Sequence, residues 1–220
     1  DNATSKWILP LCNLCALRVR KENDEMTQKI LYSFPSINYK VSILSNTGSL
    51  PAVYRQYTGS IQYTYHTINT SNTNLAKEKG YQQIIWTDAN NHEYLEEAGT
   101  MNIFFRINDN LVTAPTNDRI LDGITRKSII QLAKDKGIVC EVRPVKVSEI
   151  KDAFNNGSLK EIFGTGTAAV INPILGFGHQ GQNYELPKIK ESYATMLKDK
   201  MLQIQYNKSS DPHGWRHEVL

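Results

Sequence analysis

The sequence is short of cysteine, lacks any long apolar run and carries almost no excess charge of either sign. Three cysteines in 220 residues are too few for a disulfide scaffold. No apolar run approaches the roughly 20 residues that a membrane-spanning helix needs, so we expect no membrane partner. Lys and Arg total 25 against 22 Asp and Glu, and this formal net charge of +3 argues against a nucleic-acid partner. With 40% apolar residues, the chain has enough material for a sizeable core.

The amino-terminal region has few features that point to a function. Residues 7–17 are apolar, but the segment is short and its positive charges follow it, unlike those of a signal peptide. Cys12 and Cys15 have the spacing of a redox motif or half a zinc site, yet no second pair of ligands lies at a fitting distance. We therefore favour two ordinary thiols by about four to one and expect no metal. Because residue 1 is Asp rather than Met, we expect a processed chain or a fragment.

Hydrophobic patterning predicts a mixture of strands and helices that do not alternate regularly. Period-two runs separated by turn residues predict an antiparallel meander over residues 82–114. Together with three helical patterns, this order predicts an α+β fold, with antiparallel and mixed strands packed against helices. The predicted elements are strands at 39–44, 82–87, 93–97, 101–107, 111–114, 139–144, 161–163 and 168–171, and helices at 125–136, 148–154 and 191–205.

One loop, Leu121-Asp-Gly-Ile-Thr-Arg126, leads directly into a predicted helix. Gly123 turns the chain, and the free N–H groups of the first helical turn, with the Thr125 hydroxyl, form a suitable cradle for a phosphate. Alternatively, Asp122 or Thr125 is simply a helix cap. From this loop alone we favour the cap by about two to one.

Two further loops place small or polar residues where a ligand could approach the backbone. In residues 163–169, glycines in a predicted loop at 164–167 admit a ligand, Thr167 adds a hydroxyl, and the amides of Thr167 and Ala168 can point outward. This loop is neither a Walker loop nor a dinucleotide fingerprint, because it has no lysine and leads into a strand. Residues 96–102 contain a carboxylate pair before a glycine at a strand break, for which solvated acids at a strand edge are the alternative.

In this order and spacing, the three loops resemble the large domain of branched-chain amino acid aminotransferases, which are class IV pyridoxal-phosphate enzymes of fold type IV. The matching segments are Glu97-Ala-Gly-Thr-Met-Asn-Ile-Phe104, Leu121–Arg126 and Phe163-Gly-Thr-Gly-Thr-Ala168, supported by Lys79–Trp86 and by the tail with Gly214-Trp215. The resemblance implies a fold-type-IV large domain over residues 54–220 that binds pyridoxal phosphate. Residues 1–53 are then a remnant or an atypical amino-terminal region.

The resemblance implies roles for particular side chains around the cofactor. Glu97 matches the acid that faces the pyridine nitrogen and keeps it protonated, so that the ring can withdraw electrons from the reacting carbon. The amides of Thr167 and Ala168 match the contacts to the substrate α-carboxylate. The other matched cofactor contacts are Thr100 beside the ring, and Ile124, Thr125 and Thr167 at the phosphate.

The lysine that forms the Schiff base in this family has no clear counterpart. Two ways of counting the spacing place it at Ile61 or Gln62, and neither side chain can form an imine. Lys40, Lys77 and Lys79 are the nearest lysines in the sequence. For Lys77 and Lys79, a solvated charge near a helix end is the simpler interpretation.

Two functions follow from the resemblance. The first is transfer of an amino group between Leu, Ile or Val and 2-oxoglutarate, with an amino acid and a 2-oxo acid as the small-molecule partners and a homodimer as the assembly. The second is a catalytically dead relative that still binds the cofactor or serves as a dimer partner. An α+β domain that has lost both functions is a third, blander alternative. The compartment stays open between cytoplasm and mitochondrion.

Overall fold

The computed structural model describes residues 6–8, 39–44, 74–88 and 90–219. The motif at Cys12 and Cys15 and the two candidate lysine positions, Ile61 and Gln62, lie outside these ranges. The predicted domain boundary between residues 53 and 54 also lies outside them and stays a prediction. None of the helices within the described ranges is long and apolar enough to cross a membrane.

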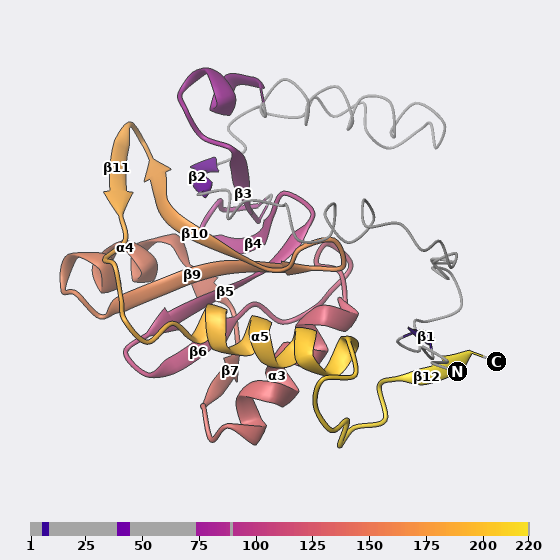
Figure 1. Cartoon of the computed structure of the whole chain (residues 1–220). Coiled ribbons are helices and arrows are strands. Elements are labelled where there is room, and N and C mark those ends of the chain that lie inside the picture. The colour runs from indigo at the N-terminus through magenta and orange to yellow at the C-terminus, as the bar shows by residue number, and fades with distance from the viewer. Residues whose placement is uncertain (1–5, 9–38, 45–73, 89, 220) are drawn as a thin grey trace, which may run out of the picture.

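A ten-stranded sheet forms the centre of the molecule (Figure 1). Its strands run in the order β7-β6-β5-β9-β10-β2-β3-β4-β8, with β11 added to β10 and a further pairing between β5 and β4 that closes part of the sheet into a ring. The strands are β2 (Tyr39–Leu44), β3 (Gln83–Thr87), β4 (Tyr94–Ala98), β5 (Met101–Ile107), β6 (Asn110–Thr113), β7 (Cys140–Val142), β8 (Val145–Lys146), β9 (Leu159–Gly166), β10 (Val170–His179) and β11 (Gln182–Glu185).

The predicted meander and the predicted amino-terminal strand are both confirmed. Strands β3 to β6 pair antiparallel in sequence order, within one residue of the predicted bounds. Strand β2 has the predicted bounds and lies between β10 and β3, parallel to both. A separate two-stranded sheet pairs β1 (Lys6–Ile8) with β12 (His217–Val219).

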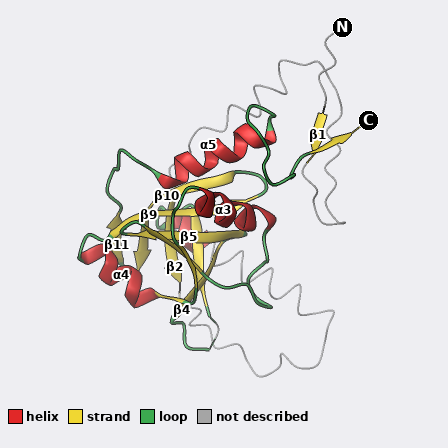
Figure 2. Ribbon diagram, turned by 90° about the horizontal axis from the view of Figure 1, so that it is seen from below, coloured by secondary structure: helices red, strands yellow, loops and turns green. Residues whose placement is uncertain are grey.

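The sheet is covered by helices α3 (Ile124–Asp135), α4 (Val147–Asn155) and α5 (Tyr193–Gln205). Helices α3 and α5 lie beside each other over one face, and α4 packs elsewhere against β8 and β9 (Figure 2). Each helix buries an apolar stripe, as its spacing predicts. One core cluster lies under α3 and α5 and includes Phe104, Phe163, Leu132 and Leu197. The other includes Ile85, Phe105, Ile150 and Phe177.

Strands β9 and β10 are longer than predicted, and the predicted glycine loop at 164–167 is wrong. Gly164 and Gly166 are strand residues that pair with β10. A Cβ on Gly164 would lie 2.9 Å from the end of the Met101 side chain, so glycine here lets that side chain pack closely over the strand and does not serve a turn. The actual turn is Thr167–Ala169.

Cys140 on β7 has a free, half-buried thiol. Burial raises the pKa of its thiol to about 11, which leaves about one thiolate in a thousand at pH 8. In a chain with Cys12→Ser and Cys15→Ser, we expect iodoacetamide to label Cys140 about two orders of magnitude more slowly when the chain is folded than in concentrated urea. Labelling followed by mass spectrometry measures both rates. Similar rates in the two states would contradict the prediction.

Candidate functional site

Glu97 lies on β4 at a β-bulge. Ile85 and Thr87 of β3 are two residues apart, but their partners on β4, Ala98 and Leu95, are three apart, so β4 contains one extra residue. Leu95 and Ala98 both reach the same apolar core as a result. Bulges redirect side chains and are common beside active sites. Here the bulge leaves Glu97 half-buried and directed away from that core.

The Glu97 carboxylate is held by two donors on one of its oxygens. Oε1 accepts hydrogen bonds from the Leu121 N–H at 3.0 Å and from Asn102 Nδ2 at 3.1 Å. Burial raises the pKa of Glu97, the Leu121 N–H lowers it, and the nearby Glu96 carboxylate raises it further. No donor within the described residues contacts Oε2. One oxygen of the carboxylate therefore fixes the side chain.

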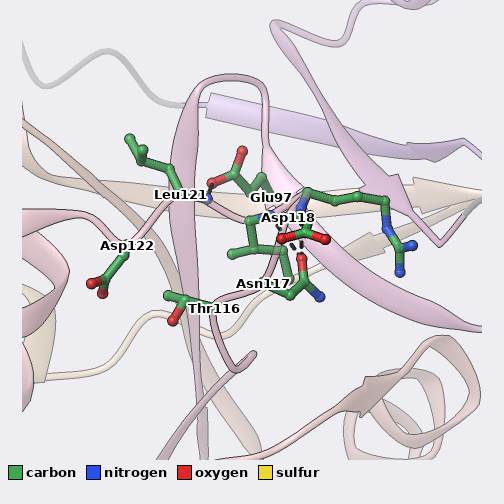
Figure 3. Close-up of a pocket in the computed structure, with 8 residues that line it drawn as sticks. Glu97, Thr116, Asn117, Asp118, Leu121 and Asp122 are labelled. Carbon is green, nitrogen blue, oxygen red and sulfur yellow. Dashed lines mark hydrogen bonds between the residues drawn. The ribbon is translucent and has the colours of Figure 1, made fainter.

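A cavity of about 470 Å³ opens beside Glu97 and the segment that follows β6 (Figure 3). Neither Thr125 nor Thr167 is among the residues that line it. The wall on this side of Glu97 is therefore built from one continuous segment before α3. The lining residues are Glu97, Thr116, Asn117, Asp118, Arg119, Ile120, Leu121 and Asp122.

Among the residues that the structure describes, no side chain caps the amino terminus of α3. Its N-cap residue is Gly123, with φ −64° and ψ 131° and no side-chain hydrogen bond to the first turn. The alternative that Asp122 or Thr125 caps the helix is therefore wrong, and Asp122 instead pairs with Lys127 at 2.5 Å. The predicted phosphate contacts Ile124 and Thr125 lie half-buried in this first turn. Unsatisfied N–H groups and the helix dipole favour an anion at this end of α3.

The predicted substrate contacts, Thr167 and Ala168, are exposed at the turn between β9 and β10. Val170 closes this turn with φ 59°, a left-handed conformation that is strained for a β-branched residue. Such strain persists only where the surrounding structure imposes it, and it is frequent at functional sites. Thr100 is exposed in the turn between β4 and β5.

Three segments that are far apart in sequence meet at Asn102 on β5, which is 5% exposed. Asn102 pairs across the sheet with Glu97 on β4 and with Thr165 on β9. Its side chain also donates to the Leu121 carbonyl oxygen at 2.8 Å. Parts of the three sequence motifs therefore lie side by side at Asn102. The roles of Glu97, Thr100, Ile124, Thr125, Thr167 and Ala168 stay predictions.

Sequence reasoning missed two polar residues at this junction. Asn102 was part of the first motif, Glu97–Phe104, but no role was predicted for it. Its position opposite Glu97 follows from the hairpin between β4 and β5. Thr165, 1% exposed, has a buried hydroxyl without a hydrogen-bond partner in the described part of the chain. Buried hydroxyls are nearly always bonded, so Thr165 Oγ1 is an open hydrogen-bonding position next to Asn102.

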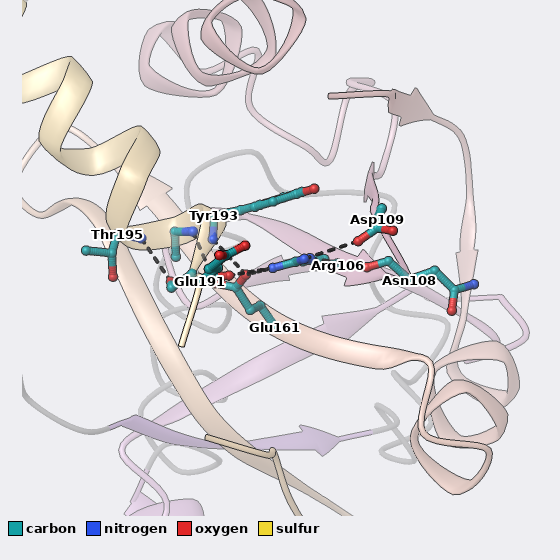
Figure 4. Close-up of polar contacts among 9 residues, drawn as sticks. Arg106, Asn108, Asp109, Glu161, Glu191, Tyr193 and Thr195 are labelled. Atoms are coloured by element: carbon teal, nitrogen blue, oxygen red, sulfur yellow. Dashed lines mark hydrogen bonds and ion pairs between the residues drawn. The ribbon is translucent and has the colours of Figure 1, made fainter. Parts of the chain in front are cut away.

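The face of the sheet that carries Glu97 and Asn102 has a second polar cluster, at the other end of β5 (Figure 4). Beyond the stacked pair of Phe104 and Phe163, Arg106 on β5 faces Glu161 on β9. Glu161 accepts hydrogen bonds from the Tyr193 N–H at 2.8 Å and the Ala194 N–H at 3.1 Å. A carboxylate of the sheet thus caps the first turn of α5 and fixes that helix over the site face.

Arg106 also holds the start of α5, and we call Arg106, Glu161 and Ser192 together the anchor of this helix. Its guanidinium donates to Glu161 at 2.9 Å and to the Glu191 carbonyl at 2.8 Å, and it lies 3.6 Å from the centroid of the Tyr193 ring. Ser192 Oγ donates to Glu161 at 2.6 Å and accepts from the Thr195 N–H at 3.0 Å. The start of α5 is therefore specified by charge, by hydrogen bonds and by an aromatic contact.

Comparisons with known proteins place the chain in a family. The profile of the family described as "Amino-transferase class IV" matches residues 62–177. A probable branched-chain-amino-acid aminotransferase of Staphylococcus epidermidis is 43% identical over 145 residues, which are 66% of this chain and 40% of that protein. The chain thus spans less than half the length of this curated relative.

Solved structures show the same fold. The branched-chain aminotransferase of Thermoproteus uzoniensis, solved with norvaline, matches with a TM-score of 0.61 and 23% identity, over 83% of this chain and 56% of that one. An aminotransferase of Brucella abortus, solved with the cofactor PLP bound, matches with a TM-score of 0.56 and 19% identity, over 76% and 54% of the two chains. These matches confirm the α+β, fold-type-IV prediction. Because the family profile spans more than half of the 220 residues, this chain belongs to the class IV aminotransferases.

Proposed function

We propose that this chain takes part in pyridoxal-phosphate-dependent transfer of an amino group between Leu, Ile or Val and 2-oxoglutarate. The observation that carries the proposal is the half-buried Glu97 carboxylate, held through one oxygen beside an uncapped helix amino terminus. An acid and an anion site at neighbouring positions suit a ligand with a basic ring nitrogen and a phosphate. The relatives that share this fold carry aminotransferase names.

The residues present fit the cofactor. Glu97 Oε2 is available for a ring N–H, the first turn of α3 offers donors to a phosphate, and Thr165 Oγ1 is a buried hydroxyl with an open hydrogen-bonding position. When bound, pyridoxal phosphate supplies the electron sink that stabilises negative charge at the substrate α-carbon. Glu97 keeps the proton on the ring nitrogen, because a carboxylate beside it favours the charged pyridinium form.

The exposed turn between β9 and β10 holds the substrate in this proposal. The amides of Thr167 and Ala168 donate to its α-carboxylate, which orients the α-carbon toward the ring. Branched aliphatic side chains are then selected by an apolar pocket, at about 1–3 kcal/mol per methylene. We further propose a homodimer as the working assembly.

The sequence around Ile61 and Gln62 favours a second candidate function, cofactor binding without turnover, since neither residue can form an imine. Addition of pyridoxal phosphate distinguishes the two functions. The aminotransferase requires an imine absorbance band that borohydride traps, and peptide mapping then identifies the labelled lysine. A bound cofactor without any labelled lysine would remove turnover and leave binding.

Binding itself has a separate prediction. Cofactor at about 100 times its Kd should stabilise the folded chain by about 2.7 kcal/mol, seen as a higher Tm. Thr125→Val and Thr167→Val should each reduce this gain, because each removes a hydroxyl from the proposed phosphate contacts. Thr195→Val is the matched control, because Thr195 lies exposed on α5, whose amino terminus is anchored at the opposite end of the sheet face. No gain in Tm for the parent chain would contradict both candidate functions.

A further inference from the structure

The side-chain amide of Asn102 makes contacts in two directions. Its Nδ2 group carries two hydrogens and donates to Glu97 Oε1 at 3.1 Å and to the Leu121 carbonyl oxygen at 2.8 Å. The Leu121 N–H returns to the same Glu97 oxygen at 3.0 Å. The three groups therefore form a closed network in which a movement of one lengthens the bonds of the other two.

The oxygen of the same amide lies against the residue that precedes α3. A Cβ placed on Gly123 would lie 2.2 Å from Asn102 Oδ1, whereas the next atoms, Asn102 Cγ and Arg126 Cβ, would lie at 3.4 Å and 3.6 Å. Oδ1 therefore rests directly against the Gly123 backbone, one residue before α3 begins. Any side chain at position 123 would push the amide aside, since contacts under 3.0 Å are not tolerated.

The donors of this amide cannot be replaced by similar side chains. An aspartate has the same shape, but an ionised one donates no hydrogen bond and would bring a second carboxylate against Glu97. An alanine would remove both bonds and leave the Leu121 carbonyl oxygen with the Gly123 N–H, at 2.8 Å, as its remaining donor. Networks of this kind contribute more together than their members do separately.

We propose that Asn102 is a positioning residue that couples the acid facing the cofactor ring to the phosphate-binding end of α3. The assignment of the two ends rests on the proposed function. The coupling itself does not, because the contacts that carry it belong to the chain alone. A single planar amide therefore keeps the helix amino terminus and the carboxylate in one fixed relation. Its Nδ2 contacts Glu97 Oε1 and the Leu121 carbonyl oxygen, and its Oδ1 contacts Gly123.

The coupling can be tested without cofactor, by carbon-detected NMR titration of the Glu97 carboxylate in the full chain. Gly123→Ala does not touch Glu97, but it displaces the amide, so the charged carboxylate loses a donor and its pKa should rise. We expect the acid dissociation constant of Glu97 to fall by about threefold or more. In an Asn102→Ala background, where Oδ1 is absent, Gly123→Ala should leave that constant unchanged.

Two further variants sharpen the test. Gly137→Ala, at the other end of α3, places a methyl group in open space on a backbone with φ 72°, so it strains the end of the helix without displacing a side chain and should not change the Glu97 titration. Asn102→Asp should raise the pKa of Glu97 more than Gly123→Ala does, because a like charge is added. An unchanged Glu97 titration in Gly123→Ala, or an equal change with and without Asn102, would overturn the coupling. If the Glu97 titration changes as expected but the cofactor causes no rise in Tm, the coupling stands and the proposed function is overturned.

Discussion

Glu161→Ala is expected to lower the free energy of unfolding by about 3–5 kcal/mol, the usual loss when one partner of a buried ion pair is removed. Glu161 is 7% exposed and accepts hydrogen bonds from Arg106, Ser192 and two backbone N–H groups of α5. Without it, the Arg106 side chain, itself 11% exposed, lacks its buried counter-charge. The Tyr193 and Ala194 N–H groups in the first turn of α5 also lose their acceptor. Urea unfolding followed by circular dichroism measures the loss.

Asp109→Ala is the matched control, since Asp109 also pairs with Arg106, at 3.2 Å, but its side chain is 86% exposed. Exposed pairs contribute about 0–1 kcal/mol, so this variant should unfold almost like the parent chain. Glu161→Gln should fall between the two, because it keeps an acceptor oxygen but loses the charge. Equal losses for Asp109→Ala and Glu161→Ala would show that the anchor is not the reason for the stability.

Phe163→Ala is expected to cost about 3–5 kcal/mol, the usual range for a buried phenylalanine. Phe163 is fully buried under α3 and α5 and stacks on Phe104, with ring centroids 5.2 Å apart and planes 8° apart. Its removal leaves a cavity and ends the ring contact. Leu175→Ala is the control on the neighbouring strand, because Leu175 is 41% exposed and such changes usually stay within about 0.5 kcal/mol.

The stack itself can be separated from the burial. In the Phe104→Ala and Phe163→Ala double variant, the loss should be smaller than the sum of the single losses, since residues in direct contact are not additive. Urea unfolding of the four chains gives the interaction free energy. Strict additivity would contradict the stacked pair as a unit of stability.

Much of the fold could be predicted because its strands and helices carry regular apolar patterns. The meander from β3 to β6, helices α3 and α5, and strand β2 all follow from spacing within the sequence. The length of β9 could not be predicted, because Gly164 and Gly166 look like loop residues until the Met101 side chain is placed against them. Closure of the sheet through β4 and β5 depends on long-range pairing, which no local pattern reports.

Only the part of the candidate site that depends on local sequence patterns could be predicted. The motifs identified Glu97 and the start of α3, but local rules favoured Asp122 or Thr125 as a cap, and Gly123 holds that position instead. The contact of Asn102 with Gly123 explains the difference, because a close approach by Oδ1 requires a residue without a side chain. Asn102 gave no signal of its own, since a single polar residue within a strand is ordinary.

The place of β2 between β10 and β3 limits how far the chain can be shortened from its amino end. A version that began after Leu44 would leave two rows of backbone donors and acceptors open in the middle of the sheet. Unpaired rows of this kind recruit strands from neighbouring molecules, so such a version would tend to form insoluble associations rather than a smaller soluble domain. The six residues of β2 are thus a structural requirement for the carboxy-terminal motifs that lie more than fifty residues away.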